Sequence, residues 1–419
     1  MEKEVRERII ALLKREVVPA IGCTEPMAVA LCTSKAKEIL GEMPVGIEVR
    51  LSPNILKNAM GVGVPGTGMV GLPIAVALGA IVGKSEYGLE VLKDIMPEAV
   101  AEGRSMIESG AINIGLKQGV HEKLYIEVIC TAADGRKATA RIAHTHTNFV
   151  GDEWQDSSVE SEQIDEDALS LRLVYDFATT APIEEIEFIN EAARMNEKAA
   201  QAALKGNYGH DLGKTLSRPL GIGIMGNSIF SHILSATSAA CDARMAGAMI
   251  PVMSNSGSGN QGIAATMPVV VFARENHNTD EELTRALILS HLTAIYVKES
   301  LGRLSALCGC VVAATGSSCG ITYLMGGKYE HVSYSVKNMI ANLAGMVCDG
   351  AKPSCALKVS SGVSTAVLSA MLAIQNRYVT SVEGLIDDDV DKSIHNLTKI
   401  GHDGMDETDR IVLDIMTSK

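Results

Sequence analysis

The alternation of apolar and polar residues predicts a small sheet in the first third of the chain. Val45–Leu51 alternates with the period of a half-buried strand. Leu124–Thr131 and Lys137–His144 alternate in the same way on either side of Asp134-Gly135, a dipeptide that favours the tight turn of a hairpin. With the helices described next, the first 150 residues are predicted to form an α+β domain with a small, mostly antiparallel sheet.

Apolar residues at helical spacing predict helices around these strands. Residues 1–41 are predicted to form one or two helices, interrupted at Gly22–Pro26. Pro26 suits the first turn of a new helix, with Thr24 as its candidate N-cap. Cys23 then lies just before a helix N-terminus, where the helix dipole favours a thiolate. Two further helices are predicted, one buried and one amphipathic: Leu72–Val82 and Tyr87–Glu102.

The second part of the chain is helical in pattern almost throughout. Gly151–Asp167 is acidic and poor in apolar residues, and it predicts an exposed connection. We therefore expect domains at 1–150 and 169–419, joined by 151–168, the second being mostly α-helical. Met267–Phe272 is the one candidate strand in it. The clearest helical segments are Ile183–Leu204, Glu281–Leu301, Val336–Met346 and Val363–Ile374.

The charge of the chain restricts its partners. The 419 residues carry a net charge of −13 and contain no Lys/Arg-rich stripe, which argues against nucleic acid. Because the overall field repels anions, a small anionic substrate would need local positive charge, a helix N-terminus or a metal. The charged, amphipathic N-terminal segment lacks the apolar core of a signal peptide, so we expect a cytoplasmic protein.

Three long segments contain no Asp, Glu, Lys or Arg: Asn58–Gly83, Met245–Ala273 and Leu304–Gly327. Their length would permit membrane spans. Glycine, proline and polar residues interrupt them, however, and a lipid bilayer cannot satisfy an irregular backbone. We interpret these segments as buried loops and helices that line a pocket, and we expect no membrane insertion.

The chain contains nine cysteines, which we expect to be thiols rather than disulfides in a protein without an export signal. Cys308 and Cys310 follow a helical segment at a Gly-containing break. A glycine and a proline between Cys348 and Cys355 bend the chain so that two thiolates can face one point. The spacing leaves three alternatives open: buried structural cysteines, an iron–sulfur cluster, or zinc.

The segment Ser254–Gly262 (SNSGSGNQG) is a polar, Gly-rich turn between two apolar runs. Its small side chains expose backbone N–H groups, and its Ser, Asn and Gln side chains add hydrogen-bond donors. Such a nest suits a carboxylate. The alternative is an ordinary helix-capping loop.

Four segments form a distinctive combination along the chain: GCTEP at Gly22–Pro26, LSPNILKNAMGVGVPGTGMVGLP at Leu51–Pro73, SNSGSGNQG, and Cys308 together with CDGAKPSCALK at Cys348–Lys358. This combination resembles the L-cysteine desulfidase family, which is related to the iron–sulfur L-serine dehydratases. The resemblance covers nearly the whole chain and is weakest at Gly151–Asp167.

The resemblance implies a [4Fe–4S] cluster held by three cysteines, with one iron left open. The matching positions are Cys308, Cys348 and Cys355. It also implies that the cysteine of the GCTEP motif, Cys23, takes part in catalysis. An open iron is exposed to oxidants, so the cluster can be absent from air-exposed protein.

The implied reaction is a β-elimination on a small L-amino acid, with L-cysteine giving pyruvate, ammonia and sulfide. The open iron would act as a Lewis acid on the β-heteroatom while a base removes the Cα proton. Cys23 as a thiolate is the first candidate for the base, and Lys352 and Lys358 are weaker ones because a lysine must be desolvated to be neutral. The candidate substrate-binding residues are Asn54, Ser254, Asn255, Ser256, Ser258, Asn260 and Gln261.

Three alternatives remain open. The nearest is an L-serine dehydratase that uses the same cluster, since one heteroatom of the substrate separates the two activities. A pyridoxal-phosphate enzyme could perform the same chemistry through a lysine. A non-catalytic metal-binding or structural protein is the third. For an acidic two-domain enzyme of this kind we expect a homodimer.

Overall fold

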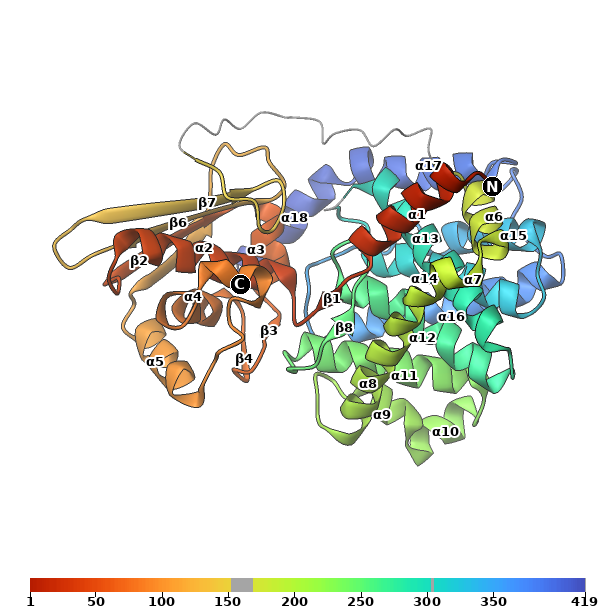
Figure 1. The fold of residues 1–419 in the computed structure, drawn as a ribbon, viewed down its shortest axis with the longest axis horizontal. Coiled ribbons are helices and arrows are strands. Elements are labelled where there is room, and N and C mark those ends of the chain that lie inside the picture. The colour runs from red at the N-terminus through yellow and green to blue at the C-terminus, as the bar shows by residue number, and fades with distance from the viewer. Residues whose placement is uncertain (152–168, 303–304, 419) are drawn as a thin grey trace.

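The computed structural model describes residues 1–151, 169–302 and 305–418. It is 62% helical and contains small sheets. Figure 1 shows a sheet body, formed mainly by residues 24–150, beside a larger helical body, formed mainly by residues 171–404. The chain is therefore mostly helical overall, and the α+β character predicted for its first part is confirmed.

The main sheet has four strands in the order β5-β2-β6-β7. Its strands are β2 Gly46–Leu51, β5 Ile112–Leu116, β6 Tyr125–Thr131 and β7 Lys137–Ala143. The β6–β7 hairpin and the β2–β6 pair are antiparallel, whereas β2 and β5 run parallel with Ile47 opposite Ile112. The sheet is mostly antiparallel, as predicted. Strand β5 was not predicted, because it is an edge strand without a clear alternation of burial.

Helices cover the sheet and pack closely on one another. These are α2 Thr24–Leu40, α3 Pro53–Ala59, α4 Leu72–Ile81, the 3-10 helix η1 Ser85–Glu90 and α5 Pro97–Glu108. A Cβ at Gly79 of α4 would lie 2.5 Å from the Ala30 carbonyl oxygen of α2, so only glycine permits this approach. The buried helix predicted at Leu72–Val82 is thus confirmed.

The helix predicted at Tyr87–Glu102 is wrong. The segment begins as a 3-10 turn that contains Gly88 at φ +54°, and the α-helix starts only at Pro97. A proline disfavours helical backbone in the residue before it, and Met96 is accordingly extended. The break therefore follows from Gly88 and Pro97, which the apolar spacing concealed.

The helical body is built around α14 Gly309–Leu324. Helices α12 Gly259–Glu275, α13 Asp280–Leu301, α15 Tyr329–Leu343 and α16 Cys355–Ile374 all pack against α14. A Cβ at Gly316 would lie 2.2 Å from the Ser290 carbonyl oxygen, so α13 and α14 touch backbone to backbone. The remaining elements are α6 Leu171–Thr180, α7 Ile183–Ile186, η2 Glu187–Ile189, α8 Asn190–Lys205, α9 Leu212–Ser217, α10 Pro219–Met225, α11 Ile229–Met245, α17 Val390–Lys399 and the π-helix η3 Ile400–Gly404.

Two predictions for this body need correction. Met267–Phe272 is not a strand but lies within α12, which includes Pro268. Its residues are buried in all directions, and such a run cannot be told from a strand by periodicity. Ile183–Leu204 is not one helix, because the 3-10 turn η2 separates α7 from α8.

The two largest hydrophobic cores do not follow the order of the chain. Ile9 and Leu13 of α1 (Lys3–Glu16) belong to the core of the helical body. At the other end, α18 (Asp406–Thr417) returns to the sheet body, where Leu413 is buried and Asp409 pairs with Lys57 of α3. The domain limits 1–150 and 169–419 stay a prediction, and the predicted connection at 151–168 lies almost wholly outside the described residues.

Two short strand pairings complete the fold. Strand β1 (Pro19–Ala20) pairs with β8 (Val252–Met253), which fixes the segment before Cys23 to the segment before Ser254. Strands β3 (Gly63–Val64) and β4 (Met69–Val70) form a small hairpin. A Cβ at Gly63 would lie 2.4 Å from the backbone of Ala246, so this hairpin lies directly against the end of α11.

Among the described residues, one helix is long and apolar enough to cross a membrane, namely α16. It packs on α11, α14 and α15 within the helical body, and half of its most apolar window is buried there. We interpret α16 as a core helix of the helical body. The cytoplasmic location stays a prediction.

Candidate active site

Cys308 and Cys348 are brought together by a short stretch of antiparallel backbone. Leu307 and Val347 form an isolated bridge. The Cys308 N–H donates to the Met346 carbonyl at 2.9 Å, and the Cys348 N–H donates to the Ala306 carbonyl at 2.7 Å. Because side chains alternate across such a pair, Cys308 and Cys348 lie on the same face of it.

Cys355 approaches the same place from a helix N-terminus. It is the first residue of α16, while Cys308 is the N-cap of α14, and the two helices pack tightly together. A helix N-terminus carries partial positive charge and stabilises a thiolate. The loop between Cys348 and Cys355 rests on α3, since a Cβ at Gly350 would lie 2.1 Å from the Lys57 carbonyl oxygen.

The three thiols interact with one another electrostatically. The Cys310 thiol donates a hydrogen bond to the Cys308 sulfur and, with the nearby Lys358, lowers the pKa of Cys308. Burial and the charge of Cys308 raise the pKa of Cys348, and burial raises the pKa of Cys355 to about 11. Cys308, Cys348 and Cys355 are therefore close enough to influence one another's pKa.

The donor set fits an iron–sulfur cluster better than a hard cation, because thiolates prefer soft metals. Cationic side chains also surround it and would offset the negative charge of three thiolates. In the described part of the chain, however, no three His, Cys, Asp or Glu side chains stand close enough to hold a metal ion. Ligation by Cys308, Cys348 and Cys355 therefore stays a prediction that requires their side chains to converge further.

Lys352 and Lys358 are both paired with Asp349. Lys352 Nζ lies 2.8 Å from an Asp349 carboxylate oxygen, and Lys358 pairs with the other oxygen and donates to the Val347 carbonyl at 2.8 Å. Burial would raise the pKa of Asp349, but the hydrogen bonds from both lysines hold that pKa at about 2. Burial would lower the pKa of Lys358, but its hydrogen bond to Asp349 raises it, so Lys358 is an ammonium and a poor base.

Two further lysines border the site and were not singled out from the sequence. Lys57 is 2% exposed, pairs with Asp409 and contributes positive charge at Cys348. Lys298 of α13 is buried beside Cys308 and Cys348, and burial lowers the pKa of its ammonium to about 8. Lys57 lies within the quoted segment Leu51–Pro73 and Lys298 within a predicted helix, but only the fold shows that both are buried next to the cysteines.

Cys23 lies at the N-cap of α2, so the candidate N-cap Thr24 is corrected to Cys23. It is 3% exposed and interacts electrostatically with Cys355 and Arg244. Burial raises the pKa of Cys23 to about 12 and outweighs the guanidinium of Arg244. The expected thiolate is thus a thiol here, because the helix N-terminus alone does not compensate for the loss of solvent.

Most polar side chains of the Ser254–Gly262 loop are used within the protein. Ser254 Oγ donates to the Val18 carbonyl at 2.6 Å, and Asn255 Nδ2 donates to the His291 carbonyl at 3.1 Å. Ser256 Oγ donates to Asn255 Oδ1 at 2.9 Å, and Ser258 caps α12. Substrate binding by these four residues stays a prediction, and the helix-capping interpretation of the loop fits Ser258.

Asn260 and Gln261 differ from the rest of the loop. Asn260 contacts two sulfur atoms, those of Cys241 at 3.4 Å and Met245 at 3.3 Å. Gln261 Oε1 is buried without a hydrogen-bond partner. A Cβ at Gly309 would lie 3.0 Å from the Gln261 amide carbon, which places Gln261 next to the residue that follows Cys308.

Asn54 lies in the first turn of α3. It is half-buried and stands one turn before Asn58, which donates to Glu25 at 3.3 Å. Residues four apart share a face of a helix. Asn54 therefore lies on the face of α3 that contacts the GCTEP segment, and its contact with a substrate stays a prediction.

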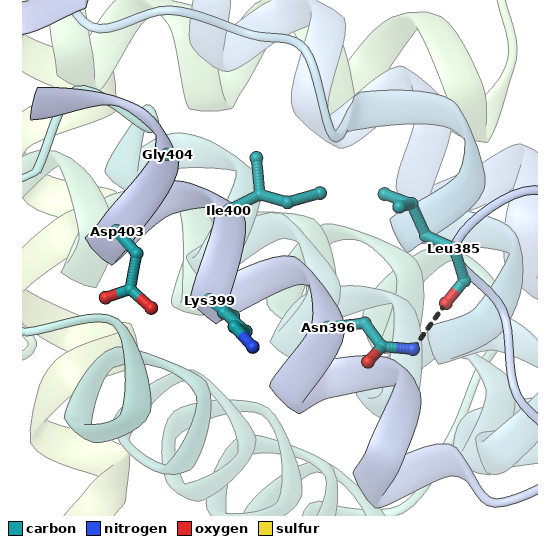
Figure 2. A pocket seen from close by; sticks show the side chains of 6 residues that line it. All are labelled: Leu385, Asn396, Lys399, Ile400, Asp403 and Gly404. Carbon is teal, nitrogen blue, oxygen red and sulfur yellow. Dashed lines mark hydrogen bonds between the residues drawn. The ribbon is translucent and has the colours of Figure 1, made fainter. Parts of the chain in front are cut away.

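An open hollow of about 420 Å³ lies elsewhere, at the π-helix η3. Figure 2 shows its lining: Leu385, Asn396, Lys399, Ile400, Asp403 and Gly404. None of the candidate residues lines it. It contains no cysteine, and we do not assign the reaction to it.

Comparison with known proteins identifies the family. Residues 86–414 match the family model of the serine dehydratase alpha chain. The chain therefore belongs to this family, and with it to a class of lyase-type enzymes with serine dehydratase-like catalysis. The resemblance stated from the sequence motifs is confirmed at this level.

The chain is also similar over its full length to proteins named only UPF0597. The relative from Phocaeicola vulgatus is 67% identical and is covered over 99% of its length. The relatives from Porphyromonas gingivalis and Photobacterium profundum are 53% and 46% identical, and both are covered completely. These names carry no activity, so the substrate is not given by the relatives.

Proposed function

We propose that this protein is an iron–sulfur-dependent L-cysteine desulfidase that converts L-cysteine into pyruvate, ammonia and sulfide. One observation carries the proposal: Cys308 and Cys355 lie at the N-termini of α14 and α16, Cys348 lies on the backbone pair beside Cys308, and Cys23 interacts electrostatically with Cys355. Members of the serine dehydratase family typically use iron–sulfur clusters. When bound, such a cluster would supply a Lewis acid for the departing β-sulfur.

The residues of the chain would bind the substrate and move its proton. Cys23 is the candidate acceptor of the Cα proton, and it must lose its own proton first. The N-terminus of α2 and the guanidinium of Arg244 are the groups that stabilise its thiolate. Lys352 and Lys358, fixed by Asp349, keep positive charge beside the cluster cysteines rather than acting as bases.

L-Serine dehydration is the second candidate function, because the matching family model is that of a serine dehydratase. Both substrates share the carboxylate, the amino group and the Cα proton. They differ in the β-heteroatom alone, and a soft sulfur is the better ligand for a thiolate-bound iron. The family also favours an enzyme over a non-catalytic metal-binding protein.

The test uses full-length protein prepared and reconstituted without oxygen. Iron and acid-labile sulfide are measured first, followed by pyruvate, ammonia and sulfide released from L-cysteine and from L-serine. We expect about four irons per chain and a higher kcat/KM for L-cysteine. A preference for L-serine would establish the second candidate, and activity without iron, combined with borohydride trapping of a lysine, would establish a pyridoxal-phosphate enzyme instead.

A further inference from the structure

Arg244, in the last turn of α11, is a buried cation without a counterion among the described residues. Arg244 is only 4% exposed, and its Nε has no hydrogen-bond partner. No acidic side chain in the described ranges forms an ion pair with it. Burial of an unpaired guanidinium is costly, so such a group points to a missing anion.

Asp242, two residues before Arg244, and Glu25, two residues after Cys23, make their hydrogen bonds with other groups. Asp242 accepts a hydrogen bond from the Gly213 N–H at 3.0 Å, toward α9. Glu25 accepts from Thr24 at 3.2 Å and from Asn58 at 3.3 Å. The guanidinium of Arg244 interacts with the Cys23 side chain, but that thiol is uncharged here, so the positive charge of Arg244 is not offset by an anion among the described residues.

The guanidinium faces the start of α12. A Cβ at Gly259 would lie 2.2 Å from Arg244 Nε and 2.9 Å from its Cζ, so the Arg244 side chain lies directly against Gly259. The first N–H groups of a helix have no partner within the helix, and α12 has 17 residues. A carboxylate at this point would meet a guanidinium and a helix N-terminus together.

The same place adjoins the proposed catalytic groups. Arg244 interacts electrostatically with Cys23, the candidate proton acceptor. Gln261, two residues after Gly259, contributes a buried Oε1 that lacks a donor and lies against Gly309, next to Cys308. The guanidinium of Arg244 is suited to the carboxylate of an α-amino acid, and the Oε1 of Gln261 is suited to accept a hydrogen bond from its ammonium group.

We infer that Arg244 binds the α-carboxylate of the substrate, with the Gln261 amide accepting a hydrogen bond from its α-ammonium group. This inference rests on the proposed function for the identity of the substrate as an amino acid. Arg244 then takes the place of the serines of the Ser254–Gly262 loop as the main carboxylate contact, because the hydroxyls of those serines are already engaged. The substrate is then fixed by its backbone atoms, and its β-substituent is free to face the cysteines.

Binding of L-alanine to the anaerobic holoenzyme, measured by calorimetry, tests the inference without turnover, because L-alanine has no leaving group. L-Alaninamide, which lacks the carboxylate, is the reference ligand. We expect Arg244→Gln to weaken binding of L-alanine by about 10- to 100-fold and to leave binding of L-alaninamide unchanged. Arg274 lies on α12, but it is exposed and pairs with Glu197. Arg274→Gln is therefore the matched control and should bind L-alanine normally.

Arg244→Lys keeps the charge and guards against a folding defect. It should retain iron content and unfolding temperature, and still raise KM for L-cysteine by about tenfold with a smaller change in kcat, since a lysine cannot bind a carboxylate bidentately. Equal binding of L-alanine by wild type and Arg244→Gln, or no binding by wild type, would overturn the inference. Wild type that binds L-alanine but turns over neither L-cysteine nor L-serine would refute the proposed function and leave the assignment of Arg244 standing.

Discussion

Buried cysteines in the two bodies differ in the pKa of their thiols, and the difference comes from the groups around them. In the sheet body, Cys32 and Cys130 are fully buried within the core, and burial raises the pKa of Cys130 to about 12. In the helical body, Cys308 is almost as deeply buried, yet its pKa is lowered. The difference comes from a helix N-terminus, a donating thiol and a lysine, so cationic and donor neighbours, rather than burial, distinguish Cys308 from the cysteines of the sheet body.

The sharpest test of this contrast removes one sulfur from each body. Cys308→Ser, Cys348→Ser and Cys355→Ser should each lose most bound iron and lower kcat/KM by about 10³-fold or more, because the cluster would lack a ligand. Cys130→Ala in the sheet body should keep iron content and activity. Iron analysis and pyruvate release measure both effects, and normal iron in all three serine variants would break the contrast.

Cys23 tests whether a buried thiol outside the predicted ligands takes part in the reaction. Cys23→Ala should keep its iron and lower kcat by about 10²- to 10⁴-fold, the range associated with loss of a general base. Cys32→Ala, which removes the next cysteine along α2, is the matched control. Undiminished turnover with an intact cluster would remove Cys23 from the mechanism.

The lysines test the electrostatic part of the contrast. Lys358→Met removes a cation next to Cys308 and Cys348, and it should lower iron retention and activity by about tenfold. Lys214→Met, which loses contacts to Gly206 and Asn207 far from the cysteines, should change neither. Iron retained after gel filtration and initial rates give the comparison; identical behaviour of the two variants would contradict the role of Lys358.

The sheet body has its own buried charge, which should affect stability rather than activity. Burial would raise the pKa of Glu127, but hydrogen bonds from Arg141, Lys117 and Tyr125 hold that pKa at about 2. A carboxyl with a depressed pKa stabilises the folded state above its unfolded pKa, and this contribution is lost as pH falls from about 4.5 to about 2. We expect Glu127→Gln to cost about 1–3 kcal/mol at pH 7, measured by urea unfolding, with the difference from wild type shrinking in acid. A difference independent of pH would exclude this origin.

Much of the fold could be predicted because its strongest elements are periodic. The β6–β7 hairpin followed from alternation on both sides of Asp134-Gly135, and α13 and α4 followed from their apolar spacing. Strand β5 and the true start of α5 could not be predicted, since an edge strand has two similar faces and a single glycine and proline override the apolar pattern. The local sequence also does not indicate that α1 packs into the helical body and α18 packs onto the sheet body.

The candidate site was predictable in its sulfur atoms and in Lys352 and Lys358, but not in its other cations. The motifs quoted from the chain marked Cys23, Cys308, Cys348 and Cys355 directly. Arg244 and Lys298 were missed because their role depends on which buried groups lack partners, and that is a property of tertiary contacts. One signal was present: Arg244 is the last charge before the uncharged segment Met245–Ala273.

The crossed termini have a consequence for how the molecule can be divided. Because α1 packs into the helical body and α18 packs onto the sheet body, each body depends on a segment from the far end of the polypeptide. If the backbone were cut once between Gly151 and Leu169, we expect the two fragments to stay associated through the exchanged helices α1 and α18. Expression of either body alone, by contrast, would expose the hydrophobic surface that the exchanged helix covers and would separate Cys23 from Cys355.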